Sequence, residues 1–146
     1  MNQPTYTVEY VLDKDRYIFE SIGPRGSIFK VVIFSEIETE TYNLGFGDYD
    51  PLTNEIDDKV VSDNGDIIKV IATVVGVALK FLAENPMTYI HIEGSSPLRT
   101  QLYNRIINRN YEDLFQTYEI YGFKNEEFEA FQKNTQYESF LIRKLF

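Results

Sequence analysis

The stretch GSSPLRTQLY, residues 94–103, contains the clearest candidate for chemistry in this sequence. A glycine, two serines and a proline come before a helical pattern. The start of such a helix presents N–H groups and hydroxyls that can hold a phosphate or a carboxylate. Arg99 and Thr100 add a charged and a neutral hydrogen-bond donor. The candidate ligand-binding residues are Gly94, Ser95, Ser96, Arg99, Thr100 and Tyr103.

A structural interpretation of the same stretch is also open. Ser95 or Ser96 can cap the helix, and GSSP lacks the glycine spacing of a P-loop or a dinucleotide fingerprint. Arg99 lies near the positive end of the helix dipole, where an unpaired cation is unfavourable. We therefore expect its guanidinium to meet a carboxylate or a bound anion. The protein carboxylates that we expect there are Asp48, Asp57 and Asp58.

Residues of the usual catalytic types are scarce. The chain has no cysteine and one histidine, His91. The missing cysteines exclude disulfides, thiol nucleophiles and Cys-type zinc sites. His91 can act as a general base in principle, but in YIHIE it occupies a surface position of a strand, on the same face as Glu93. We predict no catalytic residue and no cofactor.

The acidic segment 47–66 raises the question of a metal site. Asp48 and Asp50 have the spacing of the first two ligands of a calcium loop. Leu52 then occupies a ligand position, and Lys59 stands where the bidentate glutamate belongs. The sequence therefore predicts a solvated loop without a metal.

Charge and composition limit the classes of molecule that we expect the protein to bind. The chain of 146 residues has a formal net charge of −9, which disfavours binding to nucleic acid. One predicted helix contains Arg99, Arg105 and Arg109, which can form either a small positive patch or an ordinary solvated face. We expect one domain over residues 1–146, located in the cytoplasm and without a membrane segment. A protein partner or a homo-oligomer is compatible with the aromatic fraction of 15%.

The order of patterns predicts an α+β fold, ββββ–α–β–α–ββ–α, with a mostly antiparallel sheet. One long helix over 65–84, capped by Asp63 or Asn64, is apolar almost all round and should be buried on the sheet. Thr135 and Glu138 have capping-box spacing, which predicts a last helix. The predicted strands are 6–12, 17–22, 27–34, 40–46, 87–93, 115–123 and 128–132, and the other helices are 97–108 and 136–144.

Several motifs together resemble an uncharacterised family of small bacterial proteins with a domain-of-unknown-function label. They are YNLGFGD at 42–48, Asp57-Asp58 before VVSDNGD, KVIATV at 69–74 and GSSPLRTQLY at 94–103. The resemblance covers nearly the whole chain and implies no activity. The order of elements is also faintly similar in topology to the Whirly-like fold, which binds single-stranded nucleic acid.

Three hypotheses for function follow. The first is a non-enzymatic interaction or regulatory module, because catalytic residues are scarce and tyrosines lie on the predicted strands. The alternative is binding of an anion, a nucleotide or single-stranded nucleic acid through residues 94–103. The third is an acyltransferase-like enzyme, although SDNGD at 62–66 offers one glycine and two acidic side chains where a diphosphate would lie.

Overall fold

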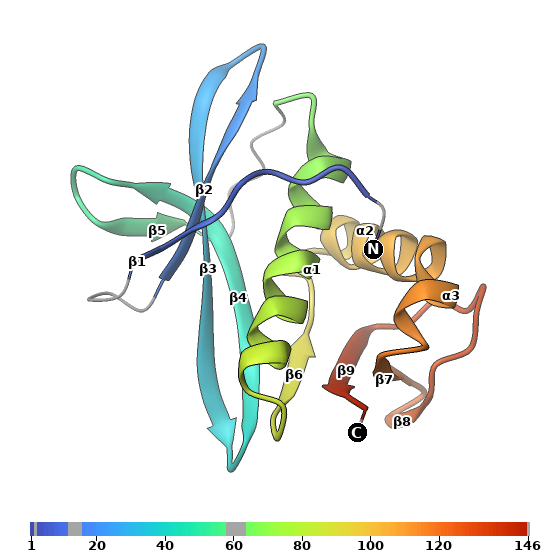
Figure 1. Ribbon diagram of the computed structural model, residues 1–146. Coiled ribbons are helices and arrows are strands. Elements are labelled where there is room, and N and C mark those ends of the chain that lie inside the picture. Colours follow the sequence, from blue (N-terminus) through green and yellow to red (C-terminus); the bar gives the residue numbers. More distant parts are fainter. Residues whose placement is uncertain (2, 12–15, 58–63, 146) are drawn as a thin grey trace.

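In the part of the chain that the structure describes, an open sheet is combined with three helices (Figure 1). The computed structural model describes residue 1 and residues 3–11, 16–57 and 64–145. The strands are β1 (Glu9–Val11), β2 (Arg16–Gly23), β3 (Gly26–Glu38), β4 (Thr41–Asp50), β5 (Glu55–Asp57), β6 (Tyr89–Ile92), β7 (Tyr118–Lys124), β8 (Glu127–Ala130) and β9 (Ser139–Lys144). The helices are α1 (Ile67–Glu84), α2 (Pro97–Arg109) and α3 (Tyr111–Leu114).

The strands form one sheet in the order β1-β2-β3-β4-β6-β9-β7-β8, and β5 pairs with β4 outside this path. Every pairing is antiparallel except that of β4 with β6, which is parallel. The parallel contact requires a long connection, and α1 supplies it. The predicted class, α+β with a mostly antiparallel sheet, is therefore confirmed.

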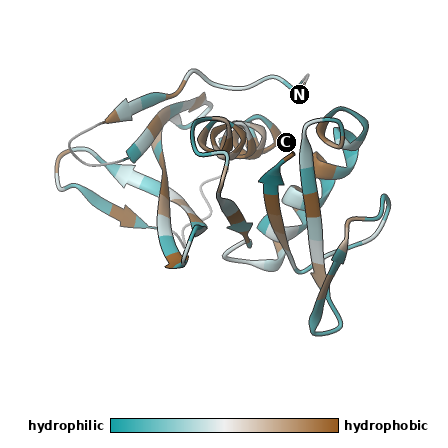
Figure 2. Cartoon of the chain, turned by 60° about the horizontal axis from the view of Figure 1, so that its bottom comes forward, coloured by the Kyte–Doolittle hydropathy of each residue, from teal (hydrophilic) through white to brown (hydrophobic). Residues whose placement is uncertain are grey.

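Helix α1 packs on the sheet, and hydrophobic residues gather on it and on the strands beneath it (Figure 2). Val70, Ile71 and Val74 are almost completely buried. Burial is not continuous around the helix, however, because Lys80 and Glu84 near its C-terminal end are exposed. The expectation of one long helix buried on most sides is thus not confirmed for its whole length. No helix in the described residues is long and apolar enough to cross a membrane.

The N-terminal segment differs from the prediction of a strand over 6–12. Only β1 pairs with the sheet, and the residues before it cross the outer side of α1 (Figure 1). The backbone N–H of Tyr6 donates to Thr73 Oγ1 at 2.9 Å, and the Met1 ammonium lies 2.6 Å from Asp113 Oδ2. Tyr6 and Met1 pack on the core from this side. The alternation of the sequence indicated a strand, but α1 offers these side chains a better apolar surface.

The predicted helix over 136–144 is wrong, because these residues contain the strand β9. Phe140 and Ile142 are buried in the core, whereas Leu141 and Arg143, which alternate with them along the strand, point to the other face. β9 lies between β6 and β7 and hydrogen-bonds with both. The capping-box spacing of the local sequence is therefore overridden by pairing with two strands that are distant in the sequence. The observed order is βββββ–α–β–α–α–βββ, with β5 and α3 as additional elements.

The start of α1 uses its polar residues differently from the prediction. Asp66 is the N-cap residue but makes no side-chain cap bond. Its Oδ2 accepts from Ser21 Oγ at 2.6 Å and from the Tyr6 hydroxyl at 2.5 Å. Asn64 is buried against the β2–β3 turn, where its Oδ1 accepts from Arg25 N at 2.7 Å. Asp63, the other predicted cap, lies outside the described residues.

The packing of α1 generates the first prediction. The substitution Ile71→Ala removes a side chain with 0% exposure and should lower the free energy of unfolding by about 2–5 kcal/mol. Lys80→Ala on the exposed side of the same helix is the control and should change it by less than about 0.5 kcal/mol. Urea denaturation measures both. Equal effects of the two substitutions would contradict the described packing.

Candidate ligand-binding site

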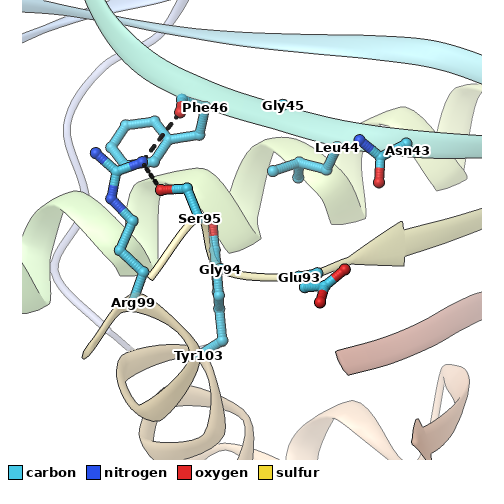
Figure 3. A pocket seen from close by; sticks show the side chains of 9 residues that line it. All are labelled: Asn43, Leu44, Gly45, Phe46, Glu93, Gly94, Ser95, Arg99 and Tyr103. Carbon is cyan, nitrogen blue, oxygen red and sulfur yellow. Dashed lines mark hydrogen bonds between the residues drawn. The ribbon is translucent and has the colours of Figure 1, made fainter. Parts of the chain in front are cut away.

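The candidate site lies where the sheet divides along one edge of β4. β3 pairs with the opposite edge of β4 along most of its length. On the divided edge, β6 pairs with Thr41–Asn43 and β5 pairs with Asp48–Asp50. On this edge, none of the described strands pairs with residues 44–47, which lie between these two pairings. The first turn of α2 faces this gap, which contains a pocket of about 230 Å³ (Figure 3).

The turn between β6 and α2 is positioned by Gly94 and Ser96. A Cβ atom added to Gly94 would lie 2.4 Å from Thr100 N, so only glycine lets the chain pass so close to α2. Ser96 is the N-cap residue, and its Oγ accepts from Arg99 N at 3.3 Å. Pro97 at the first position has no N–H. Side chains rather than free N–H groups of the helix must therefore supply most donors for a ligand.

Arg99 forms one wall of the pocket. Its side chain is buried, with 7% exposure, and its guanidinium carbon lies 4.6 Å from the centre of the Phe46 ring. Nη1 donates to the Phe46 carbonyl at 3.2 Å and to Ser95 Oγ at 2.9 Å, as Figure 3 shows. These contacts hold a positive charge at the unpaired edge of β4.

The sequence predicted Asp48, Asp57 or Asp58 as the carboxylate partner of Arg99, and these three residues lie at different places in the chain. Asp48 makes an ion pair with Lys30, which lies directly opposite it in the β3–β4 register. Asp57 lies on β5, opposite Asp48. Asp58 lies outside the described residues. The contact between Arg99 and a carboxylate of segment 47–66 stays a prediction.

Tyr103 contributes a hydroxyl that has no hydrogen-bond partner among the described residues. The side chain has 2% exposure, and its oxygen points from α2 toward Ser95 and the pocket (Figure 3). Burial raises the pKa of Tyr103, and the charge of Arg99 lowers it by a smaller amount. The hydroxyl therefore keeps its proton and can donate a hydrogen bond across the ordinary pH range.

The opposite side of the pocket comes from β4 and the end of β6. Asn43, Leu44, Gly45 and Phe46 line it together with Glu93. Sequence reasoning gave the β4 residues no role, although the motif YNLGFGD contains all four of them. YNLGFGD and GSSPLRTQLY are both among the motifs that carry the family resemblance. This joint occurrence was the available signal that the two segments lie in contact.

The structure separates the six predicted site residues into two groups. Gly94, Ser95, Arg99 and Tyr103 line one pocket. Ser96 caps α2, and Thr100 packs against the backbone of Gly94. Ser96 and Thr100 thus have structural contacts, and the role of the four pocket-lining residues stays a prediction.

The other candidate residues do not join this site. His91 Nδ1 lies 3.1 Å from Asn43 Oδ1, and His91 is not among the lining residues. Burial lowers the pKa of His91, while the charge of Glu93 raises it by less. Arg105 and Arg109 are exposed, whereas Arg99 is buried, so the three arginines of α2 form no common patch.

Comparison with protein families identifies the chain. A family model described as a family of unknown function, DUF6934, matches residues 2–145. The chain belongs to this family. Searches among curated proteins and solved structures find no match. The resemblance of this DUF6934 chain to an uncharacterised family is thus confirmed, whereas the similarity to Whirly-like proteins is not supported.

The unpartnered hydroxyl generates a prediction for the DUF6934 protein without ligand. Tyr103→Phe removes no hydrogen bond and should change the free energy of unfolding by less than about 0.5 kcal/mol. Tyr137→Phe is the control, because Tyr137 is an equally buried residue whose hydroxyl accepts from Gln132 N at 2.9 Å and donates to Glu129 Oε2 at 3.1 Å. The control should lose about 1–2 kcal/mol in the same denaturation experiment. A larger loss for Tyr103→Phe would show that the hydroxyl has a partner within the protein.

The acidic segment generates a prediction about metals. No group of three or more His, Asp or Glu residues that could hold a metal ion occurs in the described part of the chain. The melting temperature should therefore be the same in a chelator and in millimolar calcium. A rise of several degrees with calcium would reveal a site in segment 47–66.

Proposed function

We propose that this DUF6934 protein binds a small molecule by its carboxylate or phosphate group in the pocket beside β4, and that it acts by binding rather than by catalysis. The observation that carries the proposal is the hydroxyl of Tyr103. This hydroxyl makes no hydrogen bond to a described residue and faces the pocket, so its O–H is available to a ligand. A ligand with an oxygen that accepts a hydrogen bond would give it a partner.

The neighbouring groups favour an anionic acceptor. Ser95 Oγ accepts from Arg99, which leaves the O–H of Ser95 to donate. Arg99 orients the Ser95 hydroxyl by donating to its Oγ and is itself held by the Phe46 carbonyl. The hydroxyls of Ser95 and Tyr103 therefore present two donors at one wall of the pocket, which suit a carboxylate or phosphate oxygen.

The volume of the pocket limits the size of the ligand. Pockets for drug-sized ligands occupy roughly 300–1,000 Å³, and this one has about 230 Å³. A small metabolite fits this volume better than a nucleotide or a nucleic-acid strand. The net charge of −9 also disfavours polyanions.

Two features support binding without catalysis. None of the residues that line the pocket is a cysteine, histidine or lysine. The acyltransferase hypothesis would also require space for a diphosphate at the start of α1, where Asp66 accepts hydrogen bonds from Tyr6 and Ser21. A carboxylate in that position repels a diphosphate.

A second candidate function, contact with a protein partner, is favoured by the face of the sheet opposite α1. His91, Leu141 and Tyr121 lie side by side across β6, β9 and β7 on this face. Phe128 adds an exposed ring 5.0 Å from the ring of Phe123. Such aromatic surfaces are frequent at interfaces, and this one supports the hypothesis of an interaction module.

The experiment that tests the main proposal is an NMR titration with propionate, 3-phenylpropionate and inorganic phosphate. At least one of them should shift the backbone amide signals of Gly94 and Ser95 in a saturable manner. Tyr103→Phe should weaken this binding about tenfold or more, because a hydrogen bond to a charged group is lost. Tyr118→Phe, which changes a tyrosine outside the pocket, should leave it unchanged.

Two results would contradict the proposal. One is that none of the three anions shifts the signals of Gly94 and Ser95 at millimolar concentration. The other is that Tyr103→Phe binds as tightly as the unchanged protein, which would place any binding elsewhere.

A further inference from the structure

The divided edge of β4 presents backbone groups to the pocket. The Phe46 carbonyl points to this edge, because it accepts from Arg99 Nη1 at 3.2 Å (Figure 3). In a strand the N–H and C=O of one residue point to the same edge, and those of every second residue do so too. The Phe46 N–H and the Leu44 carbonyl therefore face the same gap, and both residues line the pocket.

These two groups have no strand to pair with. β6 pairs with β4 as far as Asn43, and β5 pairs with it only from Asp48 onward. In the part of the chain that the structure describes, no loop or turn donates to the Leu44 carbonyl or accepts from the Phe46 N–H. A single residue of a parallel strand beside Gly45 would do both. The edge therefore offers a place for one extended residue that the described chain does not fill.

Gly45 keeps this place open. A glycine within a strand often marks a position where a ligand or another backbone approaches closely. A Cβ atom added to Gly45 would have one close neighbour among the described residues, the Ile33 carbonyl at 3.6 Å, which is an ordinary contact. Packing within the described part of the protein thus leaves space for a side chain here. The glycine leaves that space to the pocket that it lines.

The hydroxyl groups of the pocket lie beside these backbone groups. Arg99 Nη1 bonds to the Phe46 carbonyl at 3.2 Å and to Ser95 Oγ at 2.9 Å, so the Ser95 hydroxyl lies next to this edge of β4. The Tyr103 oxygen points toward Ser95 (Figure 3). Two O–H donors and one N–H donor are thereby combined with a single acceptor, the Leu44 carbonyl.

We infer that the ligand is an N-acyl α-amino acid. Its carboxylate accepts from the hydroxyls of Ser95 and Tyr103 and from the Phe46 N–H, and its amide N–H donates to the Leu44 carbonyl. The inference rests on the proposed function and specifies the class of molecule bound. The amide N–H and the carboxylate of such a molecule belong to one residue, as the pairing with an edge of β4 requires. The volume of about 230 Å³ suits a short molecule of this class.

The alternatives use fewer of these groups. A simple carboxylate or a phosphate can accept from the hydroxyls, but neither has an N–H to donate to the Leu44 carbonyl. A free amino acid carries three N–H donors on a charged group, whereas β4 offers one neutral acceptor at this place. Burial of that charge is therefore costly. A secondary amide has one N–H and no charge, which matches the single carbonyl.

The test compares each amide with its ester by isothermal titration calorimetry. The pairs are N-acetylglycine with O-acetylglycolate, N-acetyl-L-alanine with O-acetyl-L-lactate, and N-acetyl-L-phenylalanine with the O-acetyl ester of L-phenyllactate. The ester keeps the carboxylate and the shape but has no N–H. In at least one pair the amide should bind about tenfold tighter than the ester. The corresponding free amino acid and the corresponding acid without the acylamino group should also bind more weakly than that amide.

NMR and variants identify the groups responsible. The amide should shift the carbonyl carbon signal of Leu44, and the ester should not. Both should slow the hydrogen exchange of the Phe46 N–H, because both carry the carboxylate. Tyr103→Phe should weaken both members of the pair about equally, so that the preference for the amide stays. Tyr118→Phe, outside the pocket, is the control and should change neither affinity.

The outcomes separate the inference from the proposed function. If esters, free amino acids or simple acids bind as tightly as the amides and depend on Tyr103, the N-acyl inference is wrong and the anion pocket remains. The same conclusion follows if the amide is preferred but leaves the Leu44 carbonyl signal unchanged. If no member of the set binds, or if binding does not depend on Tyr103, both fail.

Discussion

The division of one edge of β4 between β6 and β5 is the constraint on which the site depends. Backbone N–H and C=O groups inside a protein need partners, and no described strand supplies them to residues 44–47 on this edge. The Phe46 carbonyl obtains its partner from Arg99 of α2 at 3.2 Å. A helix side chain thus replaces a strand, and this requirement draws the first turn of α2 to the gap. The pocket results from the imperfect filling of that gap.

Buried asparagines hold the surrounding elements in position. Asn104 of α2 exchanges two hydrogen bonds with the backbone of Tyr137, as a strand neighbour would, at 2.8 and 2.9 Å. Asn64 binds the turn between β2 and β3, where its Nδ2 donates to the Gly26 carbonyl at 2.9 Å. Because both side chains are almost completely buried, these bonds are protected from water. α2 is thereby attached to the segment before β9, and this attachment preorganises Arg99 and Tyr103.

The partners of the charged residues are decided by strand register more than by sequence. The buried Lys30 forms an ion pair with the half-buried Asp48 because they lie opposite each other on β3 and β4. Burial of such a pair is costly unless its geometry is good, and adjacent strands provide that geometry. Arg143 and Glu119, which face each other on β9 and β7 with 2.9 Å between Nη2 and Oε2, follow the same rule.

The sequence by itself determined the elements whose signals are local. The apolar pattern of α1, the cap and proline at Ser96–Pro97 and the turn at residues 23–26 are all found where they were predicted. Each depends on residues within a few positions of one another, so propensity and periodicity suffice. Four of the six residues predicted for the site also share one pocket.

Only the tertiary structure decided the conformation of residues 139–144 and the composition of the pocket. The capping-box spacing favours a helix there, but pairing with both β6 and β7 buries Phe140 and Ile142 more completely. The wall opposite α2 comes from β4, about fifty residues earlier in the chain. No local sequence pattern predicts the contact between β4 and α2. It results from the parallel pairing of β4 with β6 and from the gap that this pairing leaves along the edge of β4.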